Sequence, residues 1–306
     1  MEKHEIKEIL KLPVEELILK ANIVRKKALK DKIELCSIMN AKSGMCSEDC
    51  KFCTQSSHYN TSVNIYSLKS KDEIIEESKK ASINGVKRFS IVTSGNKLTK
   101  EELNIIAKSI EYIRNKLDIL PCASLGAIDK KDLCMLKNAG LVRYHHNLET
   151  SERYYPYIVS THKYEQRINT IRLAKDIGLE VCSGGIFGIG ETWDDCIDMA
   201  LCLKDLNIDA VPLNFLVKIK GTPLENEPKI SVLDALKIIS IFRIILVDKD
   251  IKIIAGRETI LKDFQGMMFF SGANGIMMGG YLTTQGRLVK EDWDLINNMR
   301  RLWKEK

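Results

Sequence analysis

Short apolar runs alternate with longer amphipathic segments along most of the chain, and this alternation constrains the fold more than any other feature. A short run bounded by turn residues suits a buried strand, whereas apolar residues spaced three and four apart suit a helix. Strands separated by helices in this way pair in parallel, so the sequence predicts an α/β fold. The predicted strands are 33–38, 88–93, 120–125, 142–148, 180–187, 210–216, 251–255 and 275–278.

Two parallel architectures are compatible with these units. Eight β/α units in about 270 residues favour a closed (β/α)8 TIM-type barrel, whose functional groups lie in the loops after the strands. An open doubly wound sheet is the alternative. Because an amphipathic segment at 13–30 precedes the first strand, we expect an N-terminal helical extension over 1–31 and the barrel over 32–306.

Local helix signals agree with this division. Ser70 with Glu73, and Thr99 with Glu102, have the spacing of capping boxes, in which side chains satisfy free amides of a first helical turn. Gly85 stands between a predicted helix and a predicted strand, where the chain must leave the helical conformation.

Charges of both signs are mixed along the chain. The formal net charge of +6 comes from Lys and Arg interspersed with Asp and Glu, which does not indicate nucleic-acid binding. No stretch reaches the roughly 20 apolar residues of a membrane-spanning helix, and the N-terminus lacks the order of a signal peptide. We therefore expect a cytoplasmic protein without nucleic-acid or membrane partners. In that compartment, clustered cysteines among the nine indicate metal or redox chemistry.

Three cysteines lie close together directly after the first predicted strand. Cys46, Cys50 and Cys53 form a Cys-x3-Cys-x2-Cys loop. Three thiolates can cap three irons of a cubane cluster and leave the fourth iron open. A structural zinc site is the alternative, but it normally requires four ligands, and His58 is the nearby candidate for the fourth.

This loop, with the aromatic Phe52 before its last cysteine, resembles the motif of radical S-adenosylmethionine enzymes. The wider segment Asn40 to Tyr59 resembles the biotin synthase family more closely. The resemblance implies a [4Fe-4S] cluster on Cys46, Cys50 and Cys53, with S-adenosylmethionine on its open iron. It also implies that Phe52 lies beside the adenine.

Further segments extend the resemblance over nearly the whole predicted barrel. By this resemblance, Asn147 and Asn214 contact the substrate. The positions expected to contact S-adenosylmethionine are Phe52, Glu149, Arg167, Gly185, Ile186 and Val217. Arg167 has an alternative role as an exposed helix residue. The glycines at 184–190 do not form a dinucleotide-binding turn, because Trp193 stands where its third glycine would be.

The family also implies a second, auxiliary iron–sulfur cluster, either [2Fe-2S] or a variant, held by three Cys and one Arg. Cys122, Cys182 and Arg257 match three of these positions, but Ser90 stands at the fourth. A hydroxyl is a harder and weaker ligand for such a cluster than a thiolate. We hypothesise that Cys36, on the neighbouring first strand, takes its place.

A small buried core residue is the alternative role for Cys36. Cys134, Cys196 and Cys202 fall on predicted helices and are expected to be packing residues.

The resemblance implies a sulfurtransferase that inserts sulfur into dethiobiotin to form biotin. The expected partners are dethiobiotin, a flavodoxin or ferredoxin as electron donor, and a second copy of the chain in a homodimer. Two alternatives remain. One is a related barrel enzyme without sulfur insertion, of the hydrogenase maturase or methylornithine synthase type, and the other is a non-catalytic iron–sulfur electron carrier.

Overall fold

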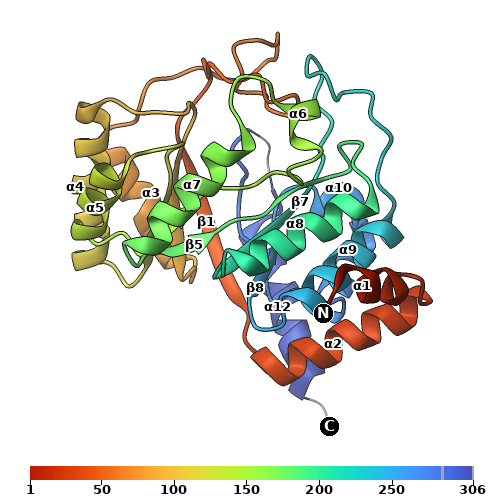
Figure 1. Cartoon of the computed structure of the whole chain (residues 1–306). Coiled ribbons are helices and arrows are strands. Elements are labelled where there is room, and N and C mark those ends of the chain that lie inside the picture. The colour runs from red at the N-terminus through yellow and green to blue at the C-terminus, as the bar shows by residue number, and fades with distance from the viewer. Residues whose placement is uncertain (284–285, 305–306) are drawn as a thin grey trace.

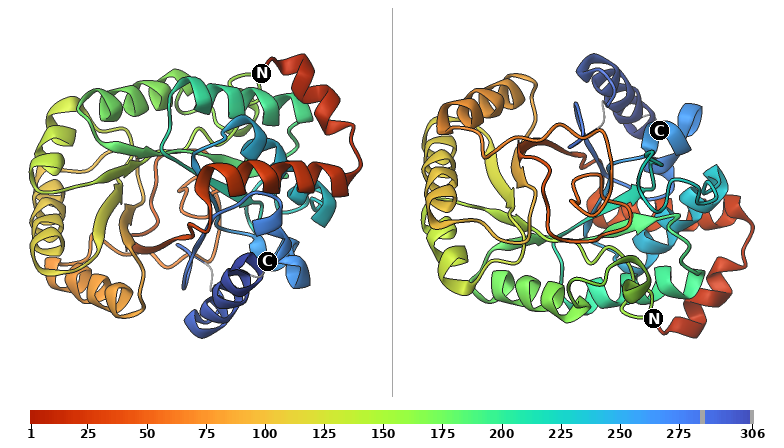
Figure 2. Two further views of the ribbon diagram at one scale, coloured as in Figure 1. Left: turned by 90° about the horizontal axis from the view of Figure 1, so that it is seen from below. Right: turned by 90° about the horizontal axis from the view of Figure 1, so that it is seen from above.

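In the computed structural model, parallel strands close into a barrel around which the helices form an outer ring (Figures 1 and 2). The structure describes residues 1–283 and 286–304, so the last two positions of the expected barrel segment, 305–306, lie outside the described residues. The strands are β1 (Glu34–Lys42), β2 (Arg88–Thr93), β3 (Leu120–Ser124), β4 (Arg143–His145), β5 (Glu180–Cys182), β6 (Gly185–Phe187), β7 (Ala210–Phe215), β8 (Asp250–Ile253) and β9 (Gly275–Met277).

The strand order is β5-β4-β3-β2-β1-β9-β8-β7-β6, and a pairing between β5 and β7 completes the closed barrel. This confirms the TIM-type barrel and excludes the open doubly wound sheet. The predicted strand at 180–187 is divided into β5 and β6. At this break Gly184 approaches β7 so closely that an added Cβ would lie 1.9 Å from the Pro212 carbonyl oxygen. Pro212 also has no N–H to contribute to a strand ladder.

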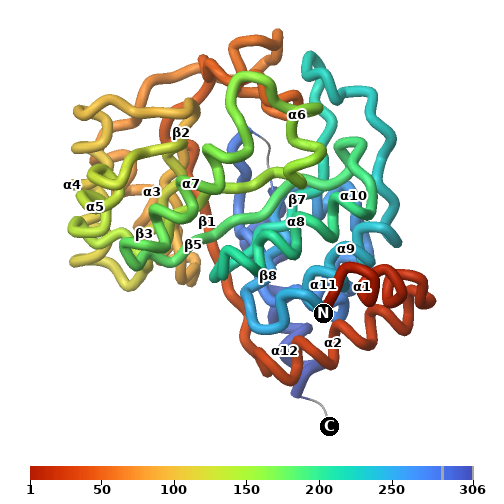
Figure 3. The backbone as a smooth tube through the Cα atoms, in the orientation of Figure 1, coloured from red at the N-terminus to blue at the C-terminus, as the bar shows by residue number. Residues whose placement is uncertain are grey.

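The helices follow the strands in turn around the barrel, as the tube trace shows (Figure 3). They are α1 (Lys3–Leu10), α2 (Val14–Leu29), α3 (Lys71–Ile83), α4 (Lys100–Lys116), α5 (Lys130–Asn138), α6 (Tyr155–Ile158), α7 (Tyr164–Asp176), α8 (Trp193–Asp205), α9 (Val232–Ile245), α10 (Arg257–Ile260), α11 (Met267–Phe270) and α12 (Val289–Lys304), with a 3-10 turn at Lys262–Phe264. None of the helices in the described residues is both long enough and apolar enough to cross a bilayer.

The two predicted capping boxes are confirmed. The Ser70 hydroxyl accepts a hydrogen bond from the Glu73 amide, and the Glu73 carboxylate accepts one from the Ser70 amide. Thr99 and Glu102 make the same reciprocal pair at the start of α4. Each pair satisfies amides that have no partner within their own helix.

The two ends of the barrel are covered by different segments. The end views show the long loop after β1 crossing one end, where the strands finish, and α2 crossing the other (Figure 2). Helix α2 is held there by packing against α9 and α11. The end beneath the loop after β1 is therefore the one available for chemistry.

A buried ion pair fixes the C-terminal helix to the barrel. Arg257 Nη2 at the start of α10 lies 2.8 Å from Asp292 Oδ1 on α12, and both side chains are fully buried. Arg257 also donates a hydrogen bond of 2.9 Å to Gln265. Removing one partner of such a pair leaves an uncompensated charge in the interior.

We predict that Asp292→Ala lowers the free energy of unfolding by about 3–5 kcal/mol, because Arg257 is left without its carboxylate. Urea denaturation measures this change. Asp194→Ala is the matched control, because its pair with Lys7 is exposed and should contribute about 1 kcal/mol or less. Equal losses in the two variants would contradict an anchoring role for the buried pair.

Candidate active site

Strand register determines which inward side chains share a level of the barrel. The strands of an eight-strand barrel are tilted, so hydrogen-bonded partners on successive strands do not lie at one height along the barrel axis. After two such steps, the residue at the original height lies about two positions further along the chain than the partner reached. Cys36 pairs with Arg88 on β2, and Arg88 pairs with Leu120 on β3. Cys122 lies two positions after Leu120, so it shares the level of Cys36. The same step leads from Cys122 to Cys182 and then to Lys252. A last step from Lys252 returns to Cys36. We call these four residues the thiol layer.

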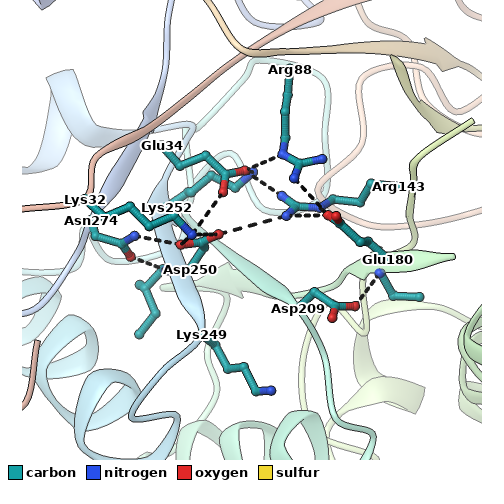
Figure 4. Close-up of polar contacts among 12 residues, drawn as sticks. Lys32, Glu34, Arg88, Arg143, Glu180, Asp209, Lys249, Asp250, Lys252 and Asn274 are labelled. Atoms are coloured by element: carbon teal, nitrogen blue, oxygen red, sulfur yellow. Dashed lines mark hydrogen bonds and ion pairs between the residues drawn. The ribbon is translucent and has the colours of Figure 1, made fainter. Parts of the chain in front are cut away.

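A network of buried charges lies beneath the thiol layer, toward the N-terminal ends of the strands (Figure 4). Glu34 Oε1 lies 2.6 Å from Arg143 Nη1 and 2.9 Å from Arg88 Nε. Glu180 Oε2 contacts the same two guanidinium groups at 2.8 and 2.9 Å. We call these four residues the charged floor. Lys252 Nζ extends from the thiol layer to within 3.3 Å of Glu34.

Cations outnumber carboxylates in this region by one, because four basic side chains face three carboxylates: Lys32, Arg88, Arg143 and Lys252 against Glu34, Glu180 and Asp250. Burial raises the pKa of Glu34, but Lys252 and the two arginines outweigh this effect and hold that pKa well below its usual range. Glu34 therefore stays ionised. The surplus of cations suits an anionic group bound in the thiol layer above.

A cavity of about 400 Å³ extends from the thiol layer to the ends of the strands. Of the residues predicted from the sequence, it is lined by Cys36, Cys122 and Cys182 at depth, and by Phe52, Cys53, Asn147, Glu149, Ile186, Asn214 and Val217 nearer the mouth. One cavity therefore brings together residues expected for both clusters, the cofactor and the substrate. Cys36 lines this cavity, as the hypothesis that it replaces the missing fourth ligand requires.

The deep thiols differ in acidity. Burial raises the pKa of Cys122 to about 11, against the effect of nearby arginines. Burial also acts on Cys182, but there the Lys252 ammonium and the nearby His145 ring outweigh it and lower the pKa to about 7. Iron must displace protons from thiols to bind, and Cys182 yields its proton most readily of the two.

Unpartnered polar atoms support the fit of an anionic group at this depth. Ser90 Oγ and Arg88 Nη1 are buried without a hydrogen-bond partner, and both residues line the cavity. Leaving such donors unsatisfied costs about 1–3 kcal/mol each. The sulfides of a cluster would accept these hydrogen bonds, so the residues present fit an iron–sulfur cluster.

The loop that carries Cys46, Cys50 and Cys53 is fixed by its own backbone and by the segment at 158–161. Cys46 N donates to the Gln55 carbonyl at 2.9 Å, and Lys51 N donates to the Ile158 carbonyl at 3.0 Å. Burial, together with the neighbouring Cys46, raises the pKa of Cys53 to about 11.

Three thiols on one loop fit a cluster in which each thiolate caps a different iron. In residues 1–283 and 286–304, no three His, Cys, Asp or Glu side chains converge on one point as the ligands of a single metal ion would. The His58 ring nitrogen Nε2, considered above for zinc, lies 2.9 Å from the Ser47 carbonyl.

A hydrogen-bonded chain links the cysteine loop to the cavity. His162 Nδ1 lies 2.7 Å from Glu48 in the loop, and His162 Nε2 lies 3.1 Å from Arg167 Nη2. A guanidinium can only donate, so His162 Nε2 accepts and its Nδ1–H donates to Glu48. Arg167 Nη1 in turn donates to the Asn147 carbonyl at 2.9 Å.

Arg167 is a buried residue of α7, not a solvent-exposed one, with its side chain 11% exposed. Its guanidinium lies 3.7 Å from the Glu149 carboxylate, which faces the cavity. Arg167 itself does not line the cavity, so it acts on the site through Glu149 and Asn147. Burial raises the pKa of Glu149, and the Arg167 charge opposes that rise.

The two asparagines are held by the backbone and keep capacity for a ligand. Asn147 Oδ1 accepts from Gly184 N at 3.2 Å, and Asn214 Oδ1 accepts from Ala255 N at 3.2 Å. Asn214 Nδ2 donates to the Gly185 carbonyl at 3.1 Å, and Asn147 Nδ2 donates to the Glu149 carboxylate at 3.3 Å. A side-chain amide has two N–H donors and two acceptor lone pairs. Each asparagine therefore keeps one donor and one acceptor for a ligand such as a ureido group.

The structure explains why a glycine is required at position 185, which the sequence did not indicate. A Cβ at this position would lie 2.3 Å from the Glu149 carbonyl oxygen. That carbonyl accepts a hydrogen bond from Ile186 N at 2.8 Å, and Ile186 is the residue of this pair that faces the cavity. Gly185 therefore allows β6 to approach the end of β4.

The structure does not bring Arg257 to the deep thiols, contrary to the expectation from the sequence. Its guanidinium is occupied by Asp292 and Gln265, and it does not line the cavity. The basic residue in the thiol layer is Lys252 of β8, five positions earlier. The prediction failed because it used the short Ala-Gly-Arg-Glu segment, whose arginine follows the strand and points toward α12.

Several cavity residues were missed at the sequence level, notably Lys252, His145 and the charged floor. A signal for them exists. Polar residues recur at every second position of otherwise apolar strands, as in Arg143-Tyr-His145-His-Asn147. Alternate strand residues share one face, so these polar positions face the lumen together. Tyr281 of the segment after β9 also lines the cavity and donates to Glu258 at 2.7 Å.

Comparison with known proteins agrees with this geometry. Residues 42–203 match the Radical SAM superfamily, and residues 212–300 match the Biotin and Thiamin Synthesis associated domain. The chain has the fold of crystallised methylornithine synthase, with a TM-score of 0.84 at 21% identity over 97% of this chain and 92% of that one. A maturase of the [FeFe]-hydrogenase gives a TM-score of 0.81 at 15% identity over 96% and 70% of the two chains.

Sequence relatives are more specific. The chain is 50% identical to the biotin synthase of Thermotoga petrophila over 298 residues, which is 97% of this chain and 98% of the relative. It is 52% identical to that of Thermodesulfovibrio yellowstonii over 276 residues, which is 90% and 87% of the two chains.

A barrel with three cysteines on the loop after its first strand, matched over that region by the superfamily model, is a radical S-adenosylmethionine enzyme. Within that superfamily, full-length identity of about half places it further. The chain belongs to the biotin synthase family.

We predict that Asp49→Ala releases iron from the first cluster about tenfold faster in the presence of a chelator. Asp49 Oδ1 accepts hydrogen bonds from Ser160 N at 2.9 Å and Thr161 N at 3.1 Å, and so fixes the cysteine loop. Asp118→Ala is the control, because that side chain is 96% exposed. The expectation fails if both variants lose iron at the rate of the unmodified protein.

Proposed function

We propose that the chain converts dethiobiotin to biotin in the cavity described above. Hydrogen is removed near the mouth of the cavity, and the sulfur comes from an auxiliary cluster held in the thiol layer. The observation that carries this proposal is that one cavity of about 400 Å³ is lined both by Cys53 of the cysteine loop and by the three deep cysteines. Members of this family use a [4Fe-4S] cluster, S-adenosylmethionine and an auxiliary iron–sulfur cluster. Hydrogenase maturase and methylornithine synthase share the fold at 21% identity or less, so they do not favour the alternative functions.

Cys46, Cys50 and Cys53 are proposed to hold the first cluster and leave one iron open. When bound and reduced, this cluster with S-adenosylmethionine supplies a 5′-deoxyadenosyl radical that removes hydrogen from unactivated carbon. Phe52, Ile186 and Val217 line the cavity near the mouth, where they pack against the adenosyl group and exclude water. Glu149 is the carboxylate available to a ribose hydroxyl, and Arg167 holds it in place.

Asn147 and Asn214 orient the substrate. Their backbone contacts lock both amides, and the remaining donor and acceptor of each match a ureido group, which also has both. The two residues share one level of the barrel above the thiol layer. A ureido ring held there has its carbon chain between the mouth and the deep thiols.

Cys36, Cys122 and Cys182 are proposed to hold the auxiliary cluster, with Cys36 taking the place left by Ser90. Lys252 is the basic residue at this site, where the resemblance implied Arg257 as the fourth residue that holds the cluster. Support comes from the shared layer, the surplus of cations in and beneath it, and the unpartnered Ser90 hydroxyl.

The external reductant is proposed to be a flavodoxin or ferredoxin, and the assembly a homodimer, as expected from the sequence. The cysteine loop lies toward the surface, with the neighbouring Met45 side chain 70% exposed. A small electron carrier could therefore approach the first cluster.

Anaerobic single turnover with dethiobiotin tests the proposed reaction. We expect biotin and 5′-deoxyadenosine to form together as the absorbance of the auxiliary cluster disappears. Cleavage of S-adenosylmethionine without any biotin, at any substrate concentration, would support a barrel enzyme that does not insert sulfur. Absence of cleavage by the reduced protein would support an electron carrier.

Substitution tests the role of Cys36. We predict that Cys36→Ala loses the iron and sulfide of the auxiliary cluster and lowers biotin yield at least about tenfold, while the first cluster is retained. Cys134→Ala is the matched control, because Cys134 lies on α5, outside the cavity lining. Full auxiliary iron in Cys36→Ala would refute the role of Cys36.

A further inference from the structure

We propose that His145 is a further ligand of the auxiliary cluster and binds iron through an imidazole nitrogen. This inference rests on the proposed role of the thiol layer. It adds a nitrogen to three thiolates, so that the cluster has a mixed ligand set.

The position of His145 is the first argument. It pairs in register with Cys182 across β4 and β5, and both residues line the cavity. The adjacent His146 points to the other side of the strand, where it is buried and stacks on Tyr144 with ring centroids 6.4 Å apart. Of these two histidines, His145 is therefore the one that faces the thiols.

The second argument is the choice of donors around the thiol layer. Lys252 lies 3.3 Å from Glu34, and an ammonium held in an ion pair has no lone pair to offer iron. Arg88 and Arg143 are bound to Glu34 and Glu180 in the charged floor.

Two candidates then remain at the level above the thiols. The Ser90 hydroxyl is a weak ligand for iron–sulfur chemistry. Imidazole binds iron well, and histidine replaces cysteine at one iron in known clusters. His145 and Ser90 share this level, which follows from the register of β2, β3 and β4.

The position also has a functional consequence. His145 lies between the thiol layer and the level of Asn147. Asn147 follows His145 by two residues on the same side of the strand, nearer the mouth of the cavity. The iron that it binds is therefore the one closest to the substrate. A neutral nitrogen in place of a thiolate also makes the cluster less negative and raises its reduction potential.

The test uses the full-length protein, reconstituted anaerobically and labelled with ¹⁵N in histidine alone. After one-electron reduction without S-adenosylmethionine, pulsed electron paramagnetic resonance should detect strong coupling to a histidine nitrogen. His145→Gln should abolish this coupling and lower auxiliary iron and sulfide. His4→Gln, on the exposed face of α1, is the control and should leave both unchanged.

A second variant distinguishes ligand loss from misfolding. His145→Cys offers a thiolate at the same position, so it should restore auxiliary iron while the histidine coupling remains absent. Unchanged coupling in His145→Gln would overturn the proposal, and so would a native auxiliary cluster that shows none. Failure of the thiol layer itself would give a different result, because the unmodified protein would then hold no auxiliary iron at all.

Discussion

The inner architecture of this barrel depends on Glu34, a single carboxylate that draws Arg88, Arg143 and Lys252 together in the closed end. Two guanidinium groups and an ammonium would repel one another without it, and each would be costly to bury alone. With Glu180 completing the network, the cations are neutralised enough to be buried but still exceed the carboxylates. The thiol layer lies directly above this surplus of charge.

Closure of the barrel turns that local network into an ordered series of levels. Every second residue of each strand faces the same lumen, and the shear brings residues from alternate strands to one height. Charged groups therefore occupy the lowest levels. The three thiols and Lys252 lie above them, then Ser90 with His145, and the two asparagines share a level near the mouth. Residues with different chemical properties are therefore separated along the axis of one barrel.

Much of this could be predicted from the sequence because the signals are local. Apolar runs located the strands to within a few residues, and β2 was predicted with its observed bounds, Arg88–Thr93. The Cys46, Cys50 and Cys53 motif is also local, since one short loop carries all three residues. The proposed auxiliary site is different, because its residues come from four strands and depend on their mutual register. Arg257 was chosen from a short matching segment, whereas only the register across β8 and β9 identifies Lys252.

The position of the thiol layer has a consequence for the life cycle of the protein. The charged floor and α2 lie across one end of the barrel, and the loop after β1 lies across the other. In the proposed arrangement, iron and sulfide that enter the deep site pass Phe52, Asn147 and Asn214, through the space proposed for substrate and cofactor. Loading of the deep site and binding of substrate would then compete for one passage.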